Sequence, residues 1–243
     1  MHRYFICFRY DGTAYHGWQV QPNGHSVQAE LQQAMSVILR EPIVIVGAGR
    51  TDAGVHARKM FAHFDFHAEI DTKQFTYKLN RLLPRDISVL NVFPVSEDMH
   101  ARFSAKWRTY HYYIHLSKNP FLRHYSCQLP YQLDFSLMNE AASHLLKVED
   151  FGAFCKSNTD VKTTLCHVVQ AEWVKVGEDA WYFVIKANRF LRNMVRAVVG
   201  TLIEVGRHRM TLDEFDAVVR SGNRTKAGES MLANALFLED VEY

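Results

Sequence analysis

Cysteines are few in this chain of 243 residues and are widely spaced, at Cys7, Cys127, Cys155 and Cys166. Zinc knuckles and zinc deaminases need closely spaced cysteines, so the absence of a C-x-x-C pair argues against both. Scattered cysteines without an obvious disulfide framework are typical of a reducing compartment. We therefore expect a cytoplasmic protein.

Long hydrophobic runs are also absent. No apolar stretch approaches the roughly 18 residues that can cross a bilayer. The first residues, MHRYFICFRYDG, are too short and too interrupted by charge to predict a signal peptide. The sequence also shows no evident Ser-His-Asp set and no glycine-rich phosphate loop ending in Lys-Ser or Lys-Thr. Any chemistry must therefore come from a different pattern.

The charges present are nearly balanced in number but unevenly placed. Residues 101–125 hold five Lys or Arg and no acid, and residues 186–226 hold nine against four acids. Residues 227–243 hold four acids and no base. Segregated basic stretches in a chain of net charge +2 predict a polyanionic partner held in a local cleft. Charges that only solvate a surface are an equally good explanation on this evidence alone.

The hydrophobic pattern of the first half, residues 1–100, predicts the order β-α-β-β-α-β. Strands are expected at 3–10, at 43–47, up to Phe66 and at 87–95. Ser26 caps the first predicted helix. Asp71 and Gln74 predict a capping box for the second helix, which ends before Pro84.

The second half, residues 101–243, repeats this order. Strands are expected at 108–116, 166–176, 180–187 and 235–243, and Asp134 caps a helix. A second helix runs from Asn188 to Gly206, and Thr211 with Glu214 opens an extra helix by a capping box. We therefore predict an α+β fold of two tandem ferredoxin-like halves, forming a mostly antiparallel sheet with helices on one side and a central cleft that is a natural ligand site.

The stretch GAGRTDAGVHA places Asp52 between Gly49 and Gly54, where the backbone can approach a ligand closely. The simpler alternative is an Asx turn, in which the aspartate bonds to its own backbone. Arg50 and His56 nearby favour a functional site over that alternative.

Three polar residues on the strand that follows, His63, Asp65 and His67, share one face at strand spacing. They could bind a metal, but exposed polar residues on a half-buried strand explain them better. We therefore predict no metal site.

Two further clusters carry possible function. The stretch ARFSAKWRTYHYYI interleaves aromatic residues with cations, as single-stranded RNA recognition requires, although Tyr110 and Tyr112 could instead be core tyrosines with bonded hydroxyls. Arg192 and Arg196 are four apart on a predicted helix and share a face. Arg196 could lie along the surface or reach into a cleft and pair with a carboxylate.

Together these stretches resemble the tRNA pseudouridine synthase A family. YDGTAYHGWQ, GRTDAGVHA, ARFSAKWRTYHY and FLRNMVRAVVG match the pattern of that family in order, over essentially the whole chain. One stretch departs from it, because SMLANALFL stands where the family usually has a proline-containing segment and a glycine.

The resemblance implies an isomerase without a cofactor, acting on uridines of the tRNA anticodon stem-loop around positions 38 to 40. It also implies a homodimer, with each active site between the two halves of a subunit. By position, Asp52 is the catalytic aspartate and Tyr110 is the active-site tyrosine that contacts the target base. Arg196 is the partner of the aspartate, and Arg50 helps to hold the target nucleotide out of the stack.

These roles suit the chemistry, because the uracil base must leave the RNA helix before the base can be turned over, at a cost of a few kcal/mol. Arg50 can fill the vacated space and bind phosphate, and the Asp52 carboxylate can attack the nucleoside or transfer protons. The Tyr110 hydroxyl could help to remove the C5 proton.

Two other classes of function compete with this interpretation. A non-enzymatic RNA-binding module would leave GRTDAG without a role. A glycosidase would need a second carboxylate that the clusters do not offer.

Overall fold

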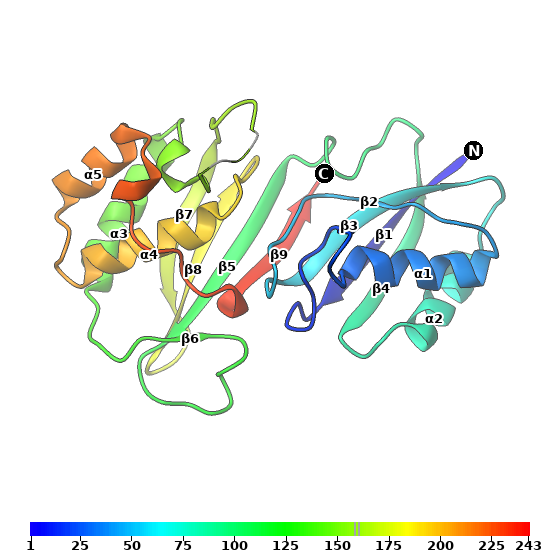
Figure 1. Cartoon of the computed structure of the whole chain (residues 1–243), viewed down its shortest axis with the longest axis horizontal. Helices are drawn as coiled ribbons and strands as arrows, with labels where there is room; N and C mark the ends of the chain where they lie inside the picture. The colour runs from blue at the N-terminus through cyan, green and yellow to red at the C-terminus, as the bar shows by residue number, and fades with distance from the viewer. Residues whose placement is uncertain (158, 160) are drawn as a thin grey trace. The chain divides into compact units, whose positions relative to one another are not determined.

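The computed structural model describes residues 1–157, 159 and 161–243, which form two compact units. The first unit comprises Met1–Lys106 together with Phe237–Tyr243, and the second comprises Trp107–Leu236 (Figure 1). The predicted halves, 1–100 and 101–243, differ from these units mainly at the end of the chain. The last strand had been expected in the second half, but its residues from Phe237 onward belong to the first unit because they pair with a strand there.

The first unit has the predicted order of elements. It contains β1 (His2–Tyr10), α1 (Val27–Leu39), β2 (Val46–Gly47), β3 (His56–Phe66), α2 (Thr72–Leu82) and β4 (Ile87–Val95). Strand β1 lies between β3 and β4, β2 pairs with β3, and all three pairings are antiparallel. This is the strand order of a ferredoxin-like unit. In addition, β9 (Leu236–Glu242) runs parallel to β3, with His56 opposite Phe237.

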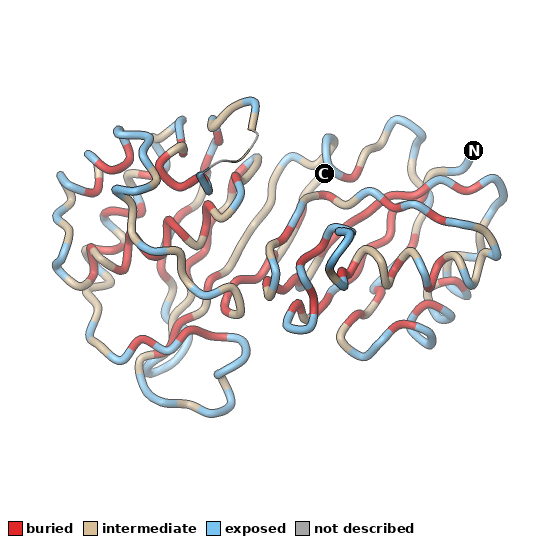
Figure 2. The backbone as a smooth tube through the Cα atoms, viewed as in Figure 1, coloured by how far each residue is buried: buried red, intermediate tan, exposed pale blue. Residues whose placement is uncertain are grey.

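Local sequence signals explain both helices of this unit. The Ser26 hydroxyl accepts a hydrogen bond from the Ala29 amide, and the Asp71 carboxylate accepts one from the Gln74 amide, so each helix begins at the predicted cap. The helices lie side by side (Figure 1). The buried backbone of Figure 2 follows the strands and the inner face of α1, whose buried residues are Val27, Leu31, Ala34 and Met35.

The second unit is built on three antiparallel strands, in which β8 (Ala180–Ala187) lies between β5 (Trp107–His115) and β7 (Val168–Lys175). A short strand that the sequence did not predict, β6 (Cys127–Gln128), pairs in parallel with β5. The helices are α3 (Phe135–His144), α4 (Met194–Gly206) and α5 (Leu212–Ser221), with short 3-10 turns η1 (Leu145–Lys147), η2 (Gly152–Phe154), η3 (Arg224–Lys226) and η4 (Ala233–Ala235). The predicted mixed α+β class with mostly antiparallel strands is confirmed.

Two of the three helix starts predicted in this unit are confirmed. The Asp134 carboxylate accepts a hydrogen bond from the Leu137 amide. Thr211 and Glu214 form a complete capping box.

The third predicted start, for α4 at Asn188, is wrong. The Asn188 side chain instead accepts a hydrogen bond from the His167 amide, and the helix begins only after Asn193, whose φ of 66° is left-handed. Arg192 therefore lies outside the helix, and the predicted helical face shared by Arg192 and Arg196 does not exist.

Helix α4 is buried on nearly every side. Its apolar residues include Val195, Val198, Val199, Leu202 and Ile203. Such an all-round apolar helix belongs inside a fold or a membrane. Here it packs against α3, and none of the helices in the described part of the chain is long and apolar enough to cross a membrane.

Candidate functional site

The Arg-Thr-Asp turn connects β2 to β3, and backbone hydrogen bonds hold it on both sides of Asp52. The Ala48 amide donates to the Phe61 carbonyl oxygen at 2.8 Å, and the Val55 amide donates to the Asp52 carbonyl oxygen at 3.2 Å. Thr51 is only 9% exposed, and its hydroxyl lies 2.8 Å from the Tyr10 hydroxyl. The backbone of Asp52 therefore takes part in closing this turn.

The segment from Gly12 to Trp18 packs directly against the turn. The Trp18 amide donates to the Thr51 carbonyl oxygen at 3.2 Å, and the Gly54 amide donates to the Tyr15 carbonyl oxygen at 3.4 Å. A Cβ on Gly12 would lie 2.0 Å from the Val55 carbonyl oxygen. The glycines of YDGTAYHGWQ are thus needed to bring this segment onto GRTDAG, which gives a physical reason for the two motifs to occur together.

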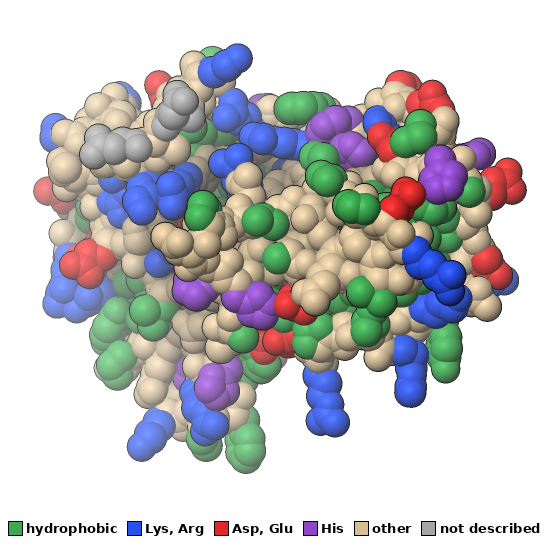
Figure 3. Space-filling view, turned by 45° about the vertical axis from the view of Figure 1, so that its right-hand side comes forward, with side chains coloured by type: hydrophobic (Ala, Val, Ile, Leu, Met, Phe, Trp, Pro, Cys, Tyr) green, Lys and Arg blue, Asp and Glu red, His purple; other side chains and the backbone are tan. Residues whose placement is uncertain are grey.

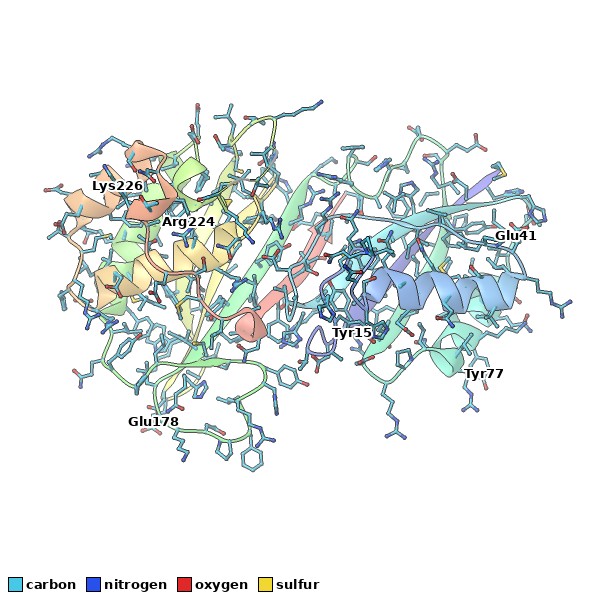
Figure 4. The ribbon with its side chains drawn as sticks, in the orientation of Figure 1. Tyr15, Glu41, Tyr77, Glu178, Arg224 and Lys226 are labelled. Carbon is cyan, nitrogen blue, oxygen red and sulfur yellow. The ribbon has the colours of Figure 1, made fainter. Side chains whose placement is uncertain are left out.

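Tyr15 also anchors the segment from Gly12 to Trp18. Its hydroxyl donates to Asp86 Oδ1 at 2.7 Å, and burial followed by this hydrogen bond raises the pKa of the phenol well above its usual value. Figure 4 shows the labelled Tyr15 in front of the strands, near the start of α1. The segment is therefore tied both to the turn and to the approach to β4.

The two glycines beside Asp52 have different roles. Gly54 has a φ of +77°, a conformation that a residue with a Cβ adopts only at a cost. Gly49 does not have a positive φ, and a Cβ added to it would meet no atom within 4 Å. Close approach of the protein backbone to a ligand, which the sequence predicts at both glycines, is sterically open at Gly49, whereas the turn itself requires a glycine at Gly54.

Arg50 and Asp52 lie on either side of the inward-pointing Thr51. Arg50 is exposed, Asp52 is partly exposed, and both belong to the first unit. His56 follows at the start of β3, where it is buried and stacks on Phe237 with ring centroids 4.5 Å apart. Its Nδ1 accepts a hydrogen bond from the Gly12 amide, so this histidine supports the turn.

The three polar residues at the end of β3 and just after it do not form one group. His63 is only 5% exposed, which corrects the expectation that it is a surface residue, and its Nδ1 accepts a hydrogen bond from the Ala101 amide. Asp65 is exposed and forms a two-point ion pair with Arg3. His67 lies 3.4 Å from a carboxylate oxygen of Glu41. In the described residues, no group of three His, Cys, Asp or Glu side chains could hold a metal ion.

Tyr110 and Arg196, the other two predicted site residues, belong to the second unit. Tyr110 is partly exposed on β5, and its ring meets that of Phe190 edge-on, with centroids 4.9 Å apart. Tyr112, two residues further on, is a buried core tyrosine whose hydroxyl donates to the Leu232 carbonyl oxygen at 3.0 Å. The core alternative considered for both tyrosines is therefore confirmed for Tyr112.

Arg196 lies in the first turn of α4 and is held by the segment that precedes β9. Its Nε donates to the Met231 carbonyl oxygen at 2.5 Å, and the Met231 amide donates back to the Arg196 carbonyl oxygen at 3.2 Å. This segment is part of SMLANALFL, the stretch that departs from the family pattern. Sequence reasoning missed its role in orienting Arg196, because backbone carbonyls leave no signature in a sequence.

Comparison with known proteins shows the family of the chain. The family model described as tRNA pseudouridine synthase matches residues 6–104 and 141–243. The chain is 56% identical over its full length to the tRNA pseudouridine synthase A of Bacteroides thetaiotaomicron, covering 91% of that protein. It is 54% identical to the protein of the same name from Bacteroides fragilis over 99% of this chain and 96% of the relative. It is 40% identical to that of Bacillus pumilus over 96% of both.

A ferredoxin-like α+β unit that carries an exposed arginine and an aspartate on one glycine-bounded turn is suited to binding and modifying a polyanionic substrate. The extent and identity of the matches make the assignment specific: this chain belongs to the tRNA pseudouridine synthase family.

Proposed function

We propose that this chain isomerises uridine to pseudouridine in tRNA, at uridines of the anticodon stem-loop around positions 38 to 40. The observation that carries the proposal is the turn at Asp52, where backbone contacts fix the position of a partly exposed carboxylate two residues after an exposed arginine. Family membership and the names of relatives at 46–56% identity support the same activity.

The reaction conserves atoms and electrons. The N1–C1′ bond of uridine breaks, the uracil turns over, and a C5–C1′ bond forms, while the proton lost from C5 is balanced by one gained at N1. No external oxidant or reductant is needed. The Asp52 carboxylate serves either as a nucleophile toward the nucleoside or as the group that moves protons and stabilises charge. Arg50 occupies the stack vacated by the flipped base and binds phosphate through its planar guanidinium group.

Tyr110 and Arg196 complete the proposed site. Tyr110 contacts the target base, and its hydroxyl helps to remove the C5 proton. Arg196 is the partner of Asp52. These two roles derive from the motifs shared with the family. The edge-on contact with Phe190 and the hydrogen bond to Met231 support them, because each contact limits the motion of a side chain that must be positioned. We also propose that the protein is a homodimer and acts in the cytoplasm.

The test uses a tRNA transcript that carries tritium at uridine C5. The wild-type protein is expected to release tritium to water and to leave the RNA chain intact, whereas a glycosidase would free uracil and a binding module would release nothing. Asp52→Asn preserves the volume of the side chain and is expected to abolish release while tRNA binding persists, because affinity comes mainly from phosphate contacts. Near-normal release by Asp52→Asn would refute the role given to this carboxylate.

A further inference from the structure

The loop between β5 and β6, residues 116–126, carries an aromatic side chain that the proposed chemistry does not use. Phe121 is 89% exposed and is the most exposed of the large hydrophobic residues in the described part of the chain. Tyr125, at the other end of the same turn, is also exposed. Figure 1 shows this loop extending from the second unit beyond β6. Two exposed aromatic rings on one loop offer surfaces on which nucleic-acid bases can stack.

The loop is held in one shape by its own hydrogen bonds. The Asn119 side chain accepts from the Phe121 amide at 2.9 Å, and the Leu122 carbonyl oxygen accepts from the Tyr125 amide at 3.0 Å. Asn234 donates to the Arg123 carbonyl oxygen at 3.1 Å and connects the loop to η4. Phe121 is thus presented on a preorganised turn, which lowers the entropy that binding must overcome.

Cations accompany the aromatic ring. Residues 116–125 contain Lys118, Arg123 and His124, all exposed, and no acidic residue. The acids of the neighbouring β7–β8 turn lie at the base of the loop, where the Leu116 amide donates to the Asp179 carbonyl oxygen and Figure 4 labels Glu178. In Figure 3, Lys or Arg, His and hydrophobic side chains gather on the protruding lobe at the lower left. Proteins that bind single-stranded RNA combine aromatic and cationic side chains in this way.

We infer that the β5–β6 loop is an RNA-binding element, in which Phe121 stacks on an unpaired base of the tRNA while Lys118 and Arg123 bind the adjacent phosphates. This inference rests on the proposed function, because it takes tRNA as the partner. A second copy of the chain fits the loop less well. One fully exposed phenyl ring flanked by cations offers far less apolar area than the roughly 800 Å² per partner of a stable protein interface.

The first measurement is the affinity of Phe121→Ala for full-length tRNA transcript. Loss of one base–aromatic stack is expected to weaken binding about tenfold. It should raise KM and leave kcat unchanged at saturating tRNA, because this contact is the same in the ground and transition states. Phe121→Trp keeps a stacking surface and should bind like the wild type. Tyr77→Ala is the matched control, since Tyr77 is also an exposed aromatic, 66% accessible on α2 (Figure 4), and its loss should change nothing.

The second measurement separates charge from stacking through the dependence of tRNA affinity on salt. Lys118→Ala combined with Arg123→Ala should reduce the slope of log K against log salt by about two, whereas Phe121→Ala should leave the slope unchanged. Unchanged affinity of Phe121→Ala for tRNA would overturn the inference. So would a loss of affinity that appears only together with a change of oligomeric state in sedimentation, because the loop would then contact a second copy.

The same assays keep this inference distinct from the proposed function. If the wild type releases no tritium but Phe121→Ala still weakens binding, the RNA contact stands and the isomerase activity fails. If the wild type releases tritium and Phe121→Ala binds normally, the isomerase stands and the RNA contact at the loop fails.

Discussion

Replacing Gly200 by alanine tests how α4 and the segment before β9 fit together. Gly200 lies inside α4, where helix propensity alone predicts that alanine stabilises the protein by about 1 kcal/mol. The structure predicts the opposite sign. A Cβ at this position would lie 1.8 Å from the Glu229 carbonyl oxygen, which is backbone and cannot rotate away. One of the two elements must therefore move.

The cost follows from what holds the two elements together. The Gly228 amide donates to the Thr201 hydroxyl at 2.9 Å, and Arg196 and Met231 exchange two hydrogen bonds. Overpacking costs typically 1–3 kcal/mol, and each weakened hydrogen bond adds about 1 kcal/mol. If overpacking costs about 2 kcal/mol and one of these hydrogen bonds is weakened, subtracting the gain in propensity leaves an expected destabilisation of about 2 kcal/mol, or roughly 4–8 °C in Tm.

The assay is thermal unfolding of the variant, with Gly177→Ala as control. A Cβ on Gly177 would come no closer than 3.6 Å to its nearest neighbour, so the control should melt close to the wild type. Turnover should also fall in Gly200→Ala, by about a hundredfold, because displacing Met231 misplaces the guanidinium group of Arg196. A Tm equal to or above that of the wild type would show that the close packing at Gly200 is not present in the protein.

Three further predictions address the first unit. Arg50→Ala should lose most of the tritium release and Arg50→Lys should recover little of it, because an ammonium group cannot stack or bind phosphate in two-pronged fashion; full activity of the lysine variant would leave only a role in charge. Burial, with smaller contributions from His100 and Arg3, lowers the pKa of His63 from 6.5 to about 4, so the unfolded chain binds a proton that the folded chain does not. Stability should therefore fall as the pH falls from 6.5 toward 4, by up to about 3 kcal/mol, and chemical denaturation of His63→Asn should show a shallower dependence on pH. Gly54→Ala, at a φ of +77°, should cost about 1–2 kcal/mol in thermal unfolding and reduce kcat, whereas unchanged values would show that the turn tolerates another conformation.

The sequence predicted the elements whose signals are local. Asp134 and Thr211 cap helices that begin where expected, because a capping side chain bonds to amides only three residues away. Asn188 has the same residue type as a helix cap, but the helix start predicted there is wrong because its side chain binds the His167 amide, which is distant in sequence. The prediction that His63 is exposed was wrong for the same reason, because the Ala101 amide that it binds comes from beyond the next strand. Pairing between distant segments leaves no periodic signature in a sequence. For this reason the sequence placed the last strand with the second half, although its residues from Phe237 onward pair with β3 and belong to the first unit.

In the candidate site, too, local features could be predicted from the sequence and long-range contacts could not. The motif around Asp52 could be recognised because its residue types are chemically unusual for a turn, whereas the contacts that fix it could not be read from the sequence. Gly12 and Gly17 lie more than thirty residues earlier, yet a Cβ on either would collide with the backbone at Val55 or Thr51. Steric fit and backbone hydrogen bonds thus help to set the position of the Asp52 backbone. Asp52→Asn keeps the side-chain volume and these backbone contacts, so its melting temperature should match that of the wild type. Loss of tritium release in a variant that melts normally then reports on chemistry rather than on folding, whereas a lowered melting temperature would show that the carboxylate also supports the turn.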